Sequence, residues 1–276
     1  MNITLRFTRL LVLFSCLFLL PELLPAQSID ELYGRETLIR GNDTLPYRIM
    51  LPKNFKKGKK YPLVLFLHGA GERGNNNEAQ LTHGAKLFAD AQNREKYPAI
   101  VVFPQCPKDN YWAKVLFSTD KDGKREFRFT PEDAPTMPMR MLMALMQQLQ
   151  DEYALNDKQL YVMGLSMGGM GTFEIVRRLP NKFAAAIPIC GGGSDQNMEQ
   201  MQGPTYWVFH GAKDDVVKLE HSTKMVAALR TVKPESEVKF TVYPDANHNS
   251  WDSTFAEPGL LDWLFSQRKH KSRKHG

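Results

Sequence analysis

Apolar residues in this chain gather in short unbroken runs that alternate with longer amphipathic stretches. The clearest run, residues 63–67, has the sequence Leu-Val-Leu-Phe-Leu and follows a Tyr-Pro pair. Unbroken runs of this length are typical of strands that are buried on both faces. We expect further buried strands at residues 99–103, 160–163, 184–189, 206–209 and 238–242.

Helical patterns fill most of the intervals between these runs. They predict helices over residues 78–92, 136–153, 168–179, 218–231 and 258–267. Two short segments, residues 36–40 and 45–51, predict an antiparallel pair of strands at the start of the fold. Strands that alternate with helices indicate an α/β protein, with a mostly parallel sheet of about eight strands covered on both faces.

One internal stretch lacks this alternation. Residues 105–134 are polar, contain Pro and Gly, and hold several aromatic residues, Trp112 among them. Long insertions after a parallel strand often carry loops that contact a substrate. We therefore expect this insertion near the functional site, where Trp112 either contacts a substrate or packs the insertion onto the body.

Composition and charge fit a globular protein. Of the 276 residues, 42% are apolar and 24% are charged, and without a repeat or long linker we expect a single domain over residues 27–268. The net charge of +6 is concentrated at the ends, and residues 269–276 are expected to be a disordered basic tail. Because the body is neutral, the charge gives no reason to expect nucleic-acid binding.

The N-terminus has the layout of an export signal. Two arginines precede an apolar run over residues 10–20, too short to cross a bilayer core that needs about 20 residues. This predicts a signal peptide over residues 1–26, cleaved after Ala26, and no stable membrane span. Alternatively, residues 13–16 form a loose lipoprotein signal that would leave a lipid on Cys16. Either way we expect a periplasmic or secreted protein.

The two remaining cysteines are Cys106 and Cys190. An oxidising compartment allows a disulfide between them, but their spacing alone does not establish one. Two buried thiols are the alternative.

A candidate nucleophile lies in residues 164–168, Gly-Leu-Ser-Met-Gly, which match the pattern G-x-S-x-G. Since a predicted strand precedes the motif and a predicted helix follows it, Ser166 should lie at a sharp strand-to-helix turn. Small neighbours are needed there because the serine adopts strained dihedral angles. The N-terminus of the following helix would also favour developing negative charge.

Two backbone N–H groups could stabilise an oxyanion beside this serine. Met167 directly follows the nucleophile and would provide one of them. The other would come from the loop after the strand at residues 63–67, from Ala70 or, as second choice, Gly71.

A serine hydroxyl also needs a general base and an acid that orients it. His248 follows the last predicted strand, and Asp214 follows the strand before it, so the chain order is Ser, acid, His. Asp215 and Asp195 remain alternatives for the acid. The candidates for substrate contact are Gly71, Trp112 and Trp251.

These motifs together resemble the α/β-hydrolase superfamily. The segments around the four regions just described, at residues 67–74, 164–169, 210–214 and 247–251, are most similar to secreted bacterial carboxylesterases related to dienelactone hydrolase, polyhydroxybutyrate depolymerase and feruloyl or acetyl-xylan esterases. The resemblance covers about residues 35–268. Dienelactone hydrolases proper use Cys as the nucleophile, so the serine counts against that activity.

The resemblance implies an α/β-hydrolase fold and a serine esterase with the triad Ser166, Asp214 and His248. The expected substrates are acyl or feruloyl esters of carbohydrate, or other small-molecule esters, cleaved through an acyl-enzyme. No cofactor or metal is expected, since the sequence has no dinucleotide fingerprint, P-loop or close His/Cys cluster.

Other functions on the same fold stay open. They are a lysophospholipase, a peptidase and an acyltransferase. From another class, the chain could be a non-catalytic surface protein that binds carbohydrate, although such decay normally removes a triad member and none is missing. The sequence does not decide between a monomer and a dimer.

Overall fold

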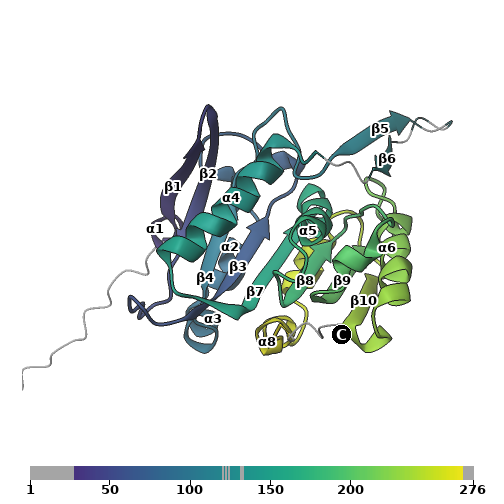
Figure 1. Ribbon diagram of the computed structural model, residues 1–276. Coiled ribbons are helices and arrows are strands. Elements are labelled where there is room, and N and C mark those ends of the chain that lie inside the picture. The colour runs from purple at the N-terminus through teal and green to yellow at the C-terminus, as the bar shows by residue number, and fades with distance from the viewer. Residues whose placement is uncertain (1–27, 120, 122, 124, 131–133, 270–276) are drawn as a thin grey trace, which may run out of the picture.

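An eight-stranded sheet forms the centre of the computed structural model, which describes residues 28–119, 121, 123, 125–130 and 134–269 (Figure 1). The strand order is β1-β2-β4-β3-β7-β8-β9-β10, and β2 pairs antiparallel with both β1 and β4. All other neighbouring strands run parallel. The predicted α/β sheet and its antiparallel start are therefore confirmed. The strands are β1 (Gly34–Arg40), β2 (Asp43–Met50), β3 (Tyr61–Leu67), β4 (Ile100–Pro104), β7 (Leu155–Leu165), β8 (Ala185–Ile189), β9 (Thr205–Gly211) and β10 (Val238–Tyr243).

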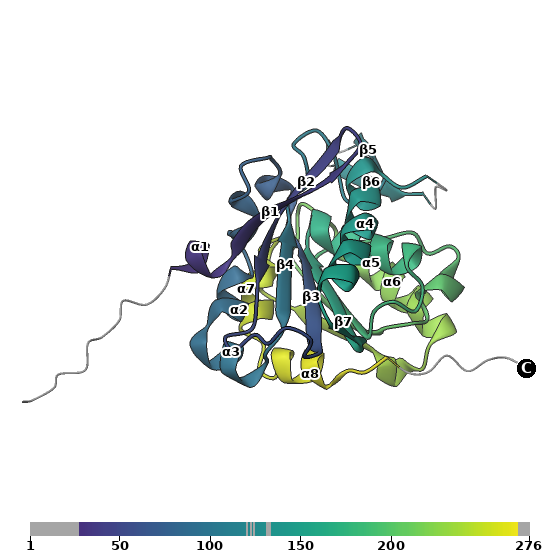
Figure 2. The ribbon, with the colours of Figure 1, turned by 60° about the vertical axis from the view of Figure 1, so that its left-hand side comes forward.

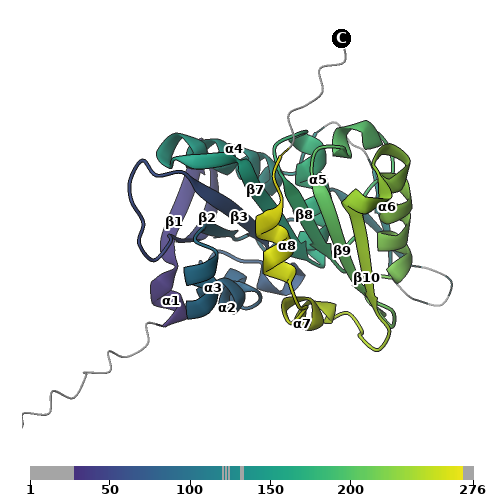
Figure 3. The ribbon, with the colours of Figure 1, turned by 90° about the horizontal axis from the view of Figure 1, so that it is seen from below.

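Helices cover both faces of this sheet. Figures 1 and 3 show α4, α5 and α6 on one face and α2, α3, α7 and α8 on the other. Each face has its own apolar core, one including Leu142 and Leu229, the other Phe88 and Leu264. Burial on both faces explains why the strands have unbroken apolar sequences. The helices are α1 (Ile29–Leu32), α2 (Ala85–Ala89), α3 (Ala91–Lys96), α4 (Met137–Glu152), α5 (Met167–Arg178), α6 (Leu219–Val232), α7 (Ser250–Phe255) and α8 (Leu260–Ser266).

Helix α4 shows how local sequence sets the ends of an element. The hydroxyl of Thr136 accepts a hydrogen bond from the N–H of Met139 (3.3 Å), and Pro138 occupies the first turn, where its missing N–H costs nothing. Leu142, Leu145 and other apolar residues then recur at helical spacing and face the sheet. The helix predicted over residues 136–153 is thus confirmed almost to its ends.

The single helix predicted over residues 78–92 is wrong. A 3₁₀ turn at Ala79–Leu81 and the short helices α2 and α3 occupy this stretch. Gly84, with a φ of 81°, precedes α2 in a left-handed conformation that suits glycine. The side chain of Asp90 then accepts hydrogen bonds from two N–H groups of the next turn (3.0 Å each) and starts α3. Capping interactions therefore divide a stretch whose apolar spacing alone predicts continuity.

The insertion at residues 105–134 contains a hairpin that its sequence pattern did not predict. Strands β5 (Val115–Thr119) and β6 (Arg125–Phe129) pair antiparallel and project from the body in Figure 1. The hairpin is attached by aromatic side chains, because Phe127 and Phe129 pack against a small cluster that includes Met170 of α5. Helices α1 and α7 are also absent from the prediction.

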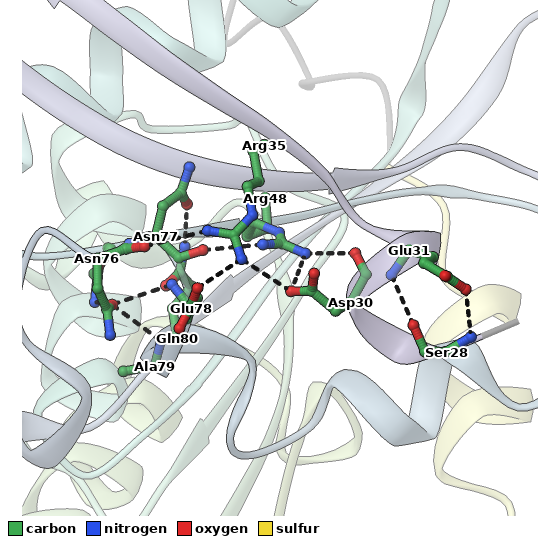
Figure 4. A network of polar contacts seen from close by, with 11 residues as sticks. Ser28, Asp30, Glu31, Arg35, Arg48, Asn76, Asn77, Glu78, Ala79 and Gln80 are labelled. Carbon is green, nitrogen blue, oxygen red and sulfur yellow. Dashed lines mark hydrogen bonds and ion pairs between the residues drawn. The ribbon is translucent and has the colours of Figure 1, made fainter.

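A buried guanidinium anchors the beginning of the described chain. Arg48 of β2 has no exposed surface and donates to Asp30 Oδ1 (2.7 Å), to the Asp30 carbonyl (2.6 Å) and to the carbonyl of Asn77 (3.1 Å) (Figure 4). This ion pair lowers the pKa of Asp30. It ties α1, seen beside β1 in Figure 2, and the turn near Asn77 to the central sheet.

Some predictions fall outside the described residues. They are the signal peptide at residues 1–26 with the alternative at Cys16, and the basic tail from residue 270 onward. Within the described part of the chain, no helix has the length and apolar character needed to cross a membrane.

Candidate active site

Ser166 lies at the turn between β7 and α5. Its φ of 53° and ψ of −117° lie outside the regions that non-glycine residues ordinarily adopt. Such strain persists only where the surroundings hold it. The N–H of Ser166 donates to the carbonyl of Ile189 in β8 (2.9 Å), which fixes the turn at the carboxyl edge of the sheet.

Close backbone packing explains the two glycines of the G-x-S-x-G motif. A Cβ on Gly164 would lie 2.4 Å from the carbonyl oxygen of Gly168. A Cβ on Gly168 would lie 1.9 Å from the carbonyl oxygen of Leu67, at the end of β3. Neither position has room for a side chain, so the glycines bring the serine turn against the loop that follows β3.

His248 and Asp214 approach Ser166 from the loops after β10 and β9. His248 Nε2 lies 2.9 Å from Ser166 Oγ, while His248 Nδ1 lies 2.9 Å from Asp214 Oδ2 and 3.1 Å from Oδ1. A carboxylate at Nδ1 keeps the ring hydrogen there, which leaves Nε2 able to accept the serine proton. The structure thus brings the three candidate side chains into one hydrogen-bonded row. The alternative acids, Asp215 and Asp195, are exposed.

Hydrogen bonds keep the buried Asp214 carboxylate charged. Its side chain has no exposed surface, and this burial alone would raise the pKa of Asp214. Hydrogen bonds from His210, His248 and the N–H of Val217 (2.8 Å) outweigh burial and hold the pKa well below its ordinary value. Asp214 therefore presents a stable negative charge to His248.

His210 is a contact of Asp214 that the sequence analysis did not identify. The fully buried ring places Nε2 3.2 Å from Asp214 Oδ2 and 2.8 Å from the carbonyl of Val217. Both neighbours are acceptors, so Nε2 carries a hydrogen. Nδ1 lies 2.7 Å from the hydroxyl of Ser222, which donates to the carbonyl of Gly191. The signal in the sequence is a histidine at a buried strand end, four residues before the candidate acid.

The two candidate oxyanion donors come from the turn at Ser166 and from the loop that follows β3. Met167 is the first residue of α5, where backbone N–H groups have no partner within the helix. Ala70 is half-buried and begins a 3₁₀ turn after Gly69, and a Cβ on Gly69 would lie 3.7 Å from Ser166 Cβ. The loop is thus next to the serine. Gly71 is exposed, with open space on its side-chain face.

The two tryptophans proposed for substrate contact differ in position. Trp112 is fully buried, and its indole N–H donates to the carbonyl of His68 (3.2 Å). A side chain without exposed surface cannot contact a bound molecule, so the structure favours the packing alternative and corrects the substrate assignment. Trp251, on α7, is half-buried and packs edge to face on His248, with 5.4 Å between ring centroids.

His68 and the two cysteines have supporting positions. His68 Nε2 accepts from the N–H of Cys106 (2.9 Å), and Nδ1 donates to the carbonyl of Gly69 (2.6 Å). Burial lowers the pKa of His68 to about 4, so it stays neutral and braces the loop after β3. Cys106 and Cys190 are both buried free thiols.

One group of possible metal ligands exists among the described residues. Cys190, Asp214 and His248 each offer a ligand atom, and these atoms lie within 4.8 Å of one another. Burial raises the pKa of the Cys190 thiol, and a protonated thiol is a poor ligand. Asp214 and His248 already bind each other, so the contacts favour the hydrogen-bonded row over a metal centre.

Comparison with known proteins gives a consistent result. A curated bifunctional acetylxylan esterase/xylanase from Neocallimastix patriciarum is 27% identical over 160 residues, which are 58% of this chain and 20% of that enzyme. A thermostable esterase of known structure is 35% identical with a TM-score of 0.75, covering 87% of this chain and 64% of its own. This chain therefore spans about a fifth of the length of the acetylxylan esterase/xylanase and just under two thirds of the length of the thermostable esterase.

A more distant structure supports the fold alone. The feruloyl esterase module of Clostridium thermocellum, solved with sinapinate, is 17% identical with a TM-score of 0.61, covering 88% of this chain and 91% of the module. The predicted α/β-hydrolase fold is confirmed. Residues 54–257 match the phospholipase/carboxylesterase family. Because this match covers most of the sequence, the protein belongs to the phospholipase/carboxylesterase family.

Proposed function

We propose that this protein is a serine carboxylic-ester hydrolase. In this proposal Ser166 is the nucleophile, His248 is the general base, and Asp214 orients His248. The observation that carries it is the contact of 2.9 Å between Ser166 Oγ and His248 Nε2, continued at 2.9 Å from Nδ1 to Asp214. Membership of a family of ester hydrolases supports the same assignment.

Acylation begins when Ser166 Oγ forms a bond to the ester carbonyl carbon. The hydroxyl proton moves to His248 Nε2, and the carbonyl oxygen becomes an oxyanion that accepts hydrogen bonds from the N–H groups of Met167 and Ala70. The bond between the carbonyl carbon and the leaving oxygen then breaks. His248 returns the proton to that oxygen, and the alcohol leaves an acyl group on Ser166.

Water completes the cycle by the reverse proton path. His248 takes a proton from a water molecule while the oxygen of that water forms a bond to the acyl carbon. The bond to Ser166 Oγ breaks, and His248 gives the proton back to the serine. The carboxylic acid is released, and the enzyme returns to its starting state.

For the substrate we propose acyl or feruloyl esters of carbohydrate. The support is the likeness to an acetylxylan esterase/xylanase, which covers 58% of this chain. We also propose export to the periplasm or the medium, on the basic and apolar pattern of residues 1–26. A lysophospholipase, a peptidase, an acyltransferase and a non-catalytic carbohydrate-binding protein are the competing functions.

The decisive experiment replaces the nucleophile. Ser166→Ala should lower kcat on p-nitrophenyl acetate by at least about a thousandfold, since the attacking oxygen is lost. Ser253→Ala, an exposed serine of α7, is the matched control and should keep the parent rate. A fluorophosphonate probe should label the parent protein but not the Ser166→Ala variant. Hydrolysis by that variant at the parent rate would refute the proposal, and an unlabelled parent would favour the non-catalytic alternative.

A further inference from the structure

A shielded carboxylate lies beside the candidate nucleophile. Glu72 ends the 3₁₀ turn at Ala70–Glu72, and only 14% of its side chain is exposed. A Cβ on Gly69 would lie 3.1 Å from Glu72 Oε2 and 3.7 Å from Ser166 Cβ. The carboxylate and the serine therefore flank the same point of the loop after β3.

The neighbouring groups leave this carboxylate without a hydrogen-bond donor. Among the described residues the side-chain nitrogen within ion-pair distance of it is Nε2 of His83, which lies 3.8 Å from Glu72 Oε1, too far for a hydrogen bond. The adjacent Arg73 is engaged elsewhere. Its Nε donates to the carbonyl of Ala70 (2.9 Å), and its guanidinium lies over the Tyr111 ring, 4.5 Å from the centroid.

Two other shielded acids among the described residues, Glu174 and Asp214, are paired. Glu174, with 11% of its side chain exposed, accepts from Arg177 (2.6 Å) and from Arg178 (2.8 Å). Asp214 accepts from two histidines and two backbone N–H groups. Neither oxygen of Glu72 is among the fully buried unpartnered atoms of the described residues, so water or a ligand can supply the hydrogen bonds that a carboxylate needs. Glu72 therefore has the properties of an acceptor whose partners arrive with a ligand.

Two aromatic rings extend from Glu72 to the catalytic base. The ring of His83 lies 5.2 Å from the ring of Trp251, which in turn packs against His248 at 5.4 Å. Glu72, His83 and Trp251 come from three separate segments and form a continuous row from Gly69 to His248. We name this row the Glu72 subsite.

The chemistry of the reaction assigns one part of the ester to this row. His248 must donate a proton to the leaving oxygen, so the leaving alcohol lies on the His248 side of Ser166. Trp251 packs edge to face on the ring of His248, and we place the alcohol between these two rings and Glu72. The Glu72 subsite therefore borders the alcohol part of the ester.

We propose that the Glu72 subsite binds the leaving alcohol and selects alcohols that carry further hydroxyl groups, as sugars do. This inference rests on the proposed esterase function. The two oxygens of Glu72 can accept hydrogen bonds from neighbouring hydroxyls, and the Trp251 ring offers an apolar surface for the C–H groups of a sugar ring. A simple alkyl alcohol would cover the carboxylate without giving it hydrogen-bond donors. Esters of such alcohols should therefore bind more weakly.

The test compares esters that share an acetyl group and differ only in the alcohol. Acetate release gives kcat/KM for mono-acetylated xylotriose, ethyl acetate and acetylcholine. The parent protein should prefer the sugar ester to ethyl acetate. Glu72→Gln removes the charge and one acceptor, and should lower this preference about tenfold. Glu95→Gln, an exposed acid of α3, is the control and should leave the preference unchanged.

Trp251→Phe provides a second measurement if Glu72→Gln does not fold, as judged by its melting transition. It keeps an aromatic ring but reduces the stacking surface, and should also lower the preference for the sugar ester. An unchanged preference in the folded variants would overturn the inference. So would a parent preference for acetylcholine that Glu72→Gln abolishes, because the site would then bind cations. If the parent cleaves no ester, or Ser166→Ala cleaves as fast, the esterase proposal itself fails.

Discussion

The carboxylate of Asp214 gives the sharpest test of the hydrogen-bonded row. Its Oδ1 accepts from the N–H groups of Val216 (3.0 Å) and Val217 (2.8 Å), while Oδ2 faces His210 and His248. In Asp214→Asn the amide oxygen should keep the backbone bonds, because the two backbone N–H groups cannot give up their hydrogens, whereas the ring of His248 can move its hydrogen from Nδ1 to Nε2. The NH₂ group therefore points at the histidines.

This change inverts the tautomer of His248, the proposed general base. With a donor facing Nδ1, the His248 ring keeps its hydrogen on Nε2, which lies 2.9 Å from Ser166 Oγ and can no longer accept the serine proton. Loss of the correct tautomer in a serine hydrolase lowers kcat by about 10⁴, equivalent to roughly 5 kcal/mol of barrier. The shape of the side chain is unchanged, so the effect is on chemistry rather than on packing.

The neighbouring acid supplies the control. Asp215 is exposed, and Asp215→Asn makes the same chemical change at a carboxylate that is not hydrogen-bonded to His248. We expect Asp215→Asn to keep kcat on p-nitrophenyl acetate within about twofold, since exposed substitutions away from the site have small effects. Both variants should show a cooperative melting transition. A kcat for Asp214→Asn within tenfold of the parent, or an equal loss in Asp215→Asn, would refute the assigned role.

Two further predictions concern the beginning of the chain. Asp30→Asn removes the ion pair with buried Arg48, and because Asp30 is exposed we expect a cost of only about 1 kcal/mol, or roughly 2–4 °C in Tm. The pKa of Asp30 is lowered in the fold, so its contribution is present at neutral pH and is lost as the carboxyl protonates in acid. The Tm difference between parent and variant should shrink below about pH 4, and a constant difference would contradict the ion pair. Sequencing of the mature N-terminus should begin at Gln27, whereas an intact Met1 on the exported protein would exclude the signal peptide.

The sheet and the serine turn could be predicted because their causes are local. Strands buried on both faces need unbroken apolar runs, and residues 63–67 show one. The close approach of backbone at Gly164 and Gly168 requires glycine, which leaves a readable motif around Ser166. Asp214 lies nearer the end of β9 than Asp215 does, and in the structure it is Asp214 that turns inward to His248.

Other elements depend on contacts that a pattern of apolar residues does not encode. Asp90 ends one short helix and caps the next, so one hydrogen-bonding side chain outweighs the spacing over residues 78–92. The hairpin of the insertion is held by Phe127 and Phe129 against a cluster contributed by distant segments. Trp112 is buried under the loop at His68, and the sequence leaves packing and substrate contact open because an aromatic residue in an insertion suits both.

The Glu72 subsite shows the same limit at the level of function. In the sequence Glu72 is followed by Arg73, and an adjacent pair of opposite charges reads as a solvated surface feature. Successive side chains diverge in the structure, so Arg73 leans on Tyr111 while Glu72 turns toward Ser166. An ion pair within this dipeptide would neutralise the carboxylate and leave nothing for a ligand to satisfy. The separation of the two charges by backbone geometry therefore leaves the carboxylate of Glu72 available to a ligand. Arg73→Gln should leave the alcohol preference of the enzyme intact, because Arg73 does not neutralise Glu72.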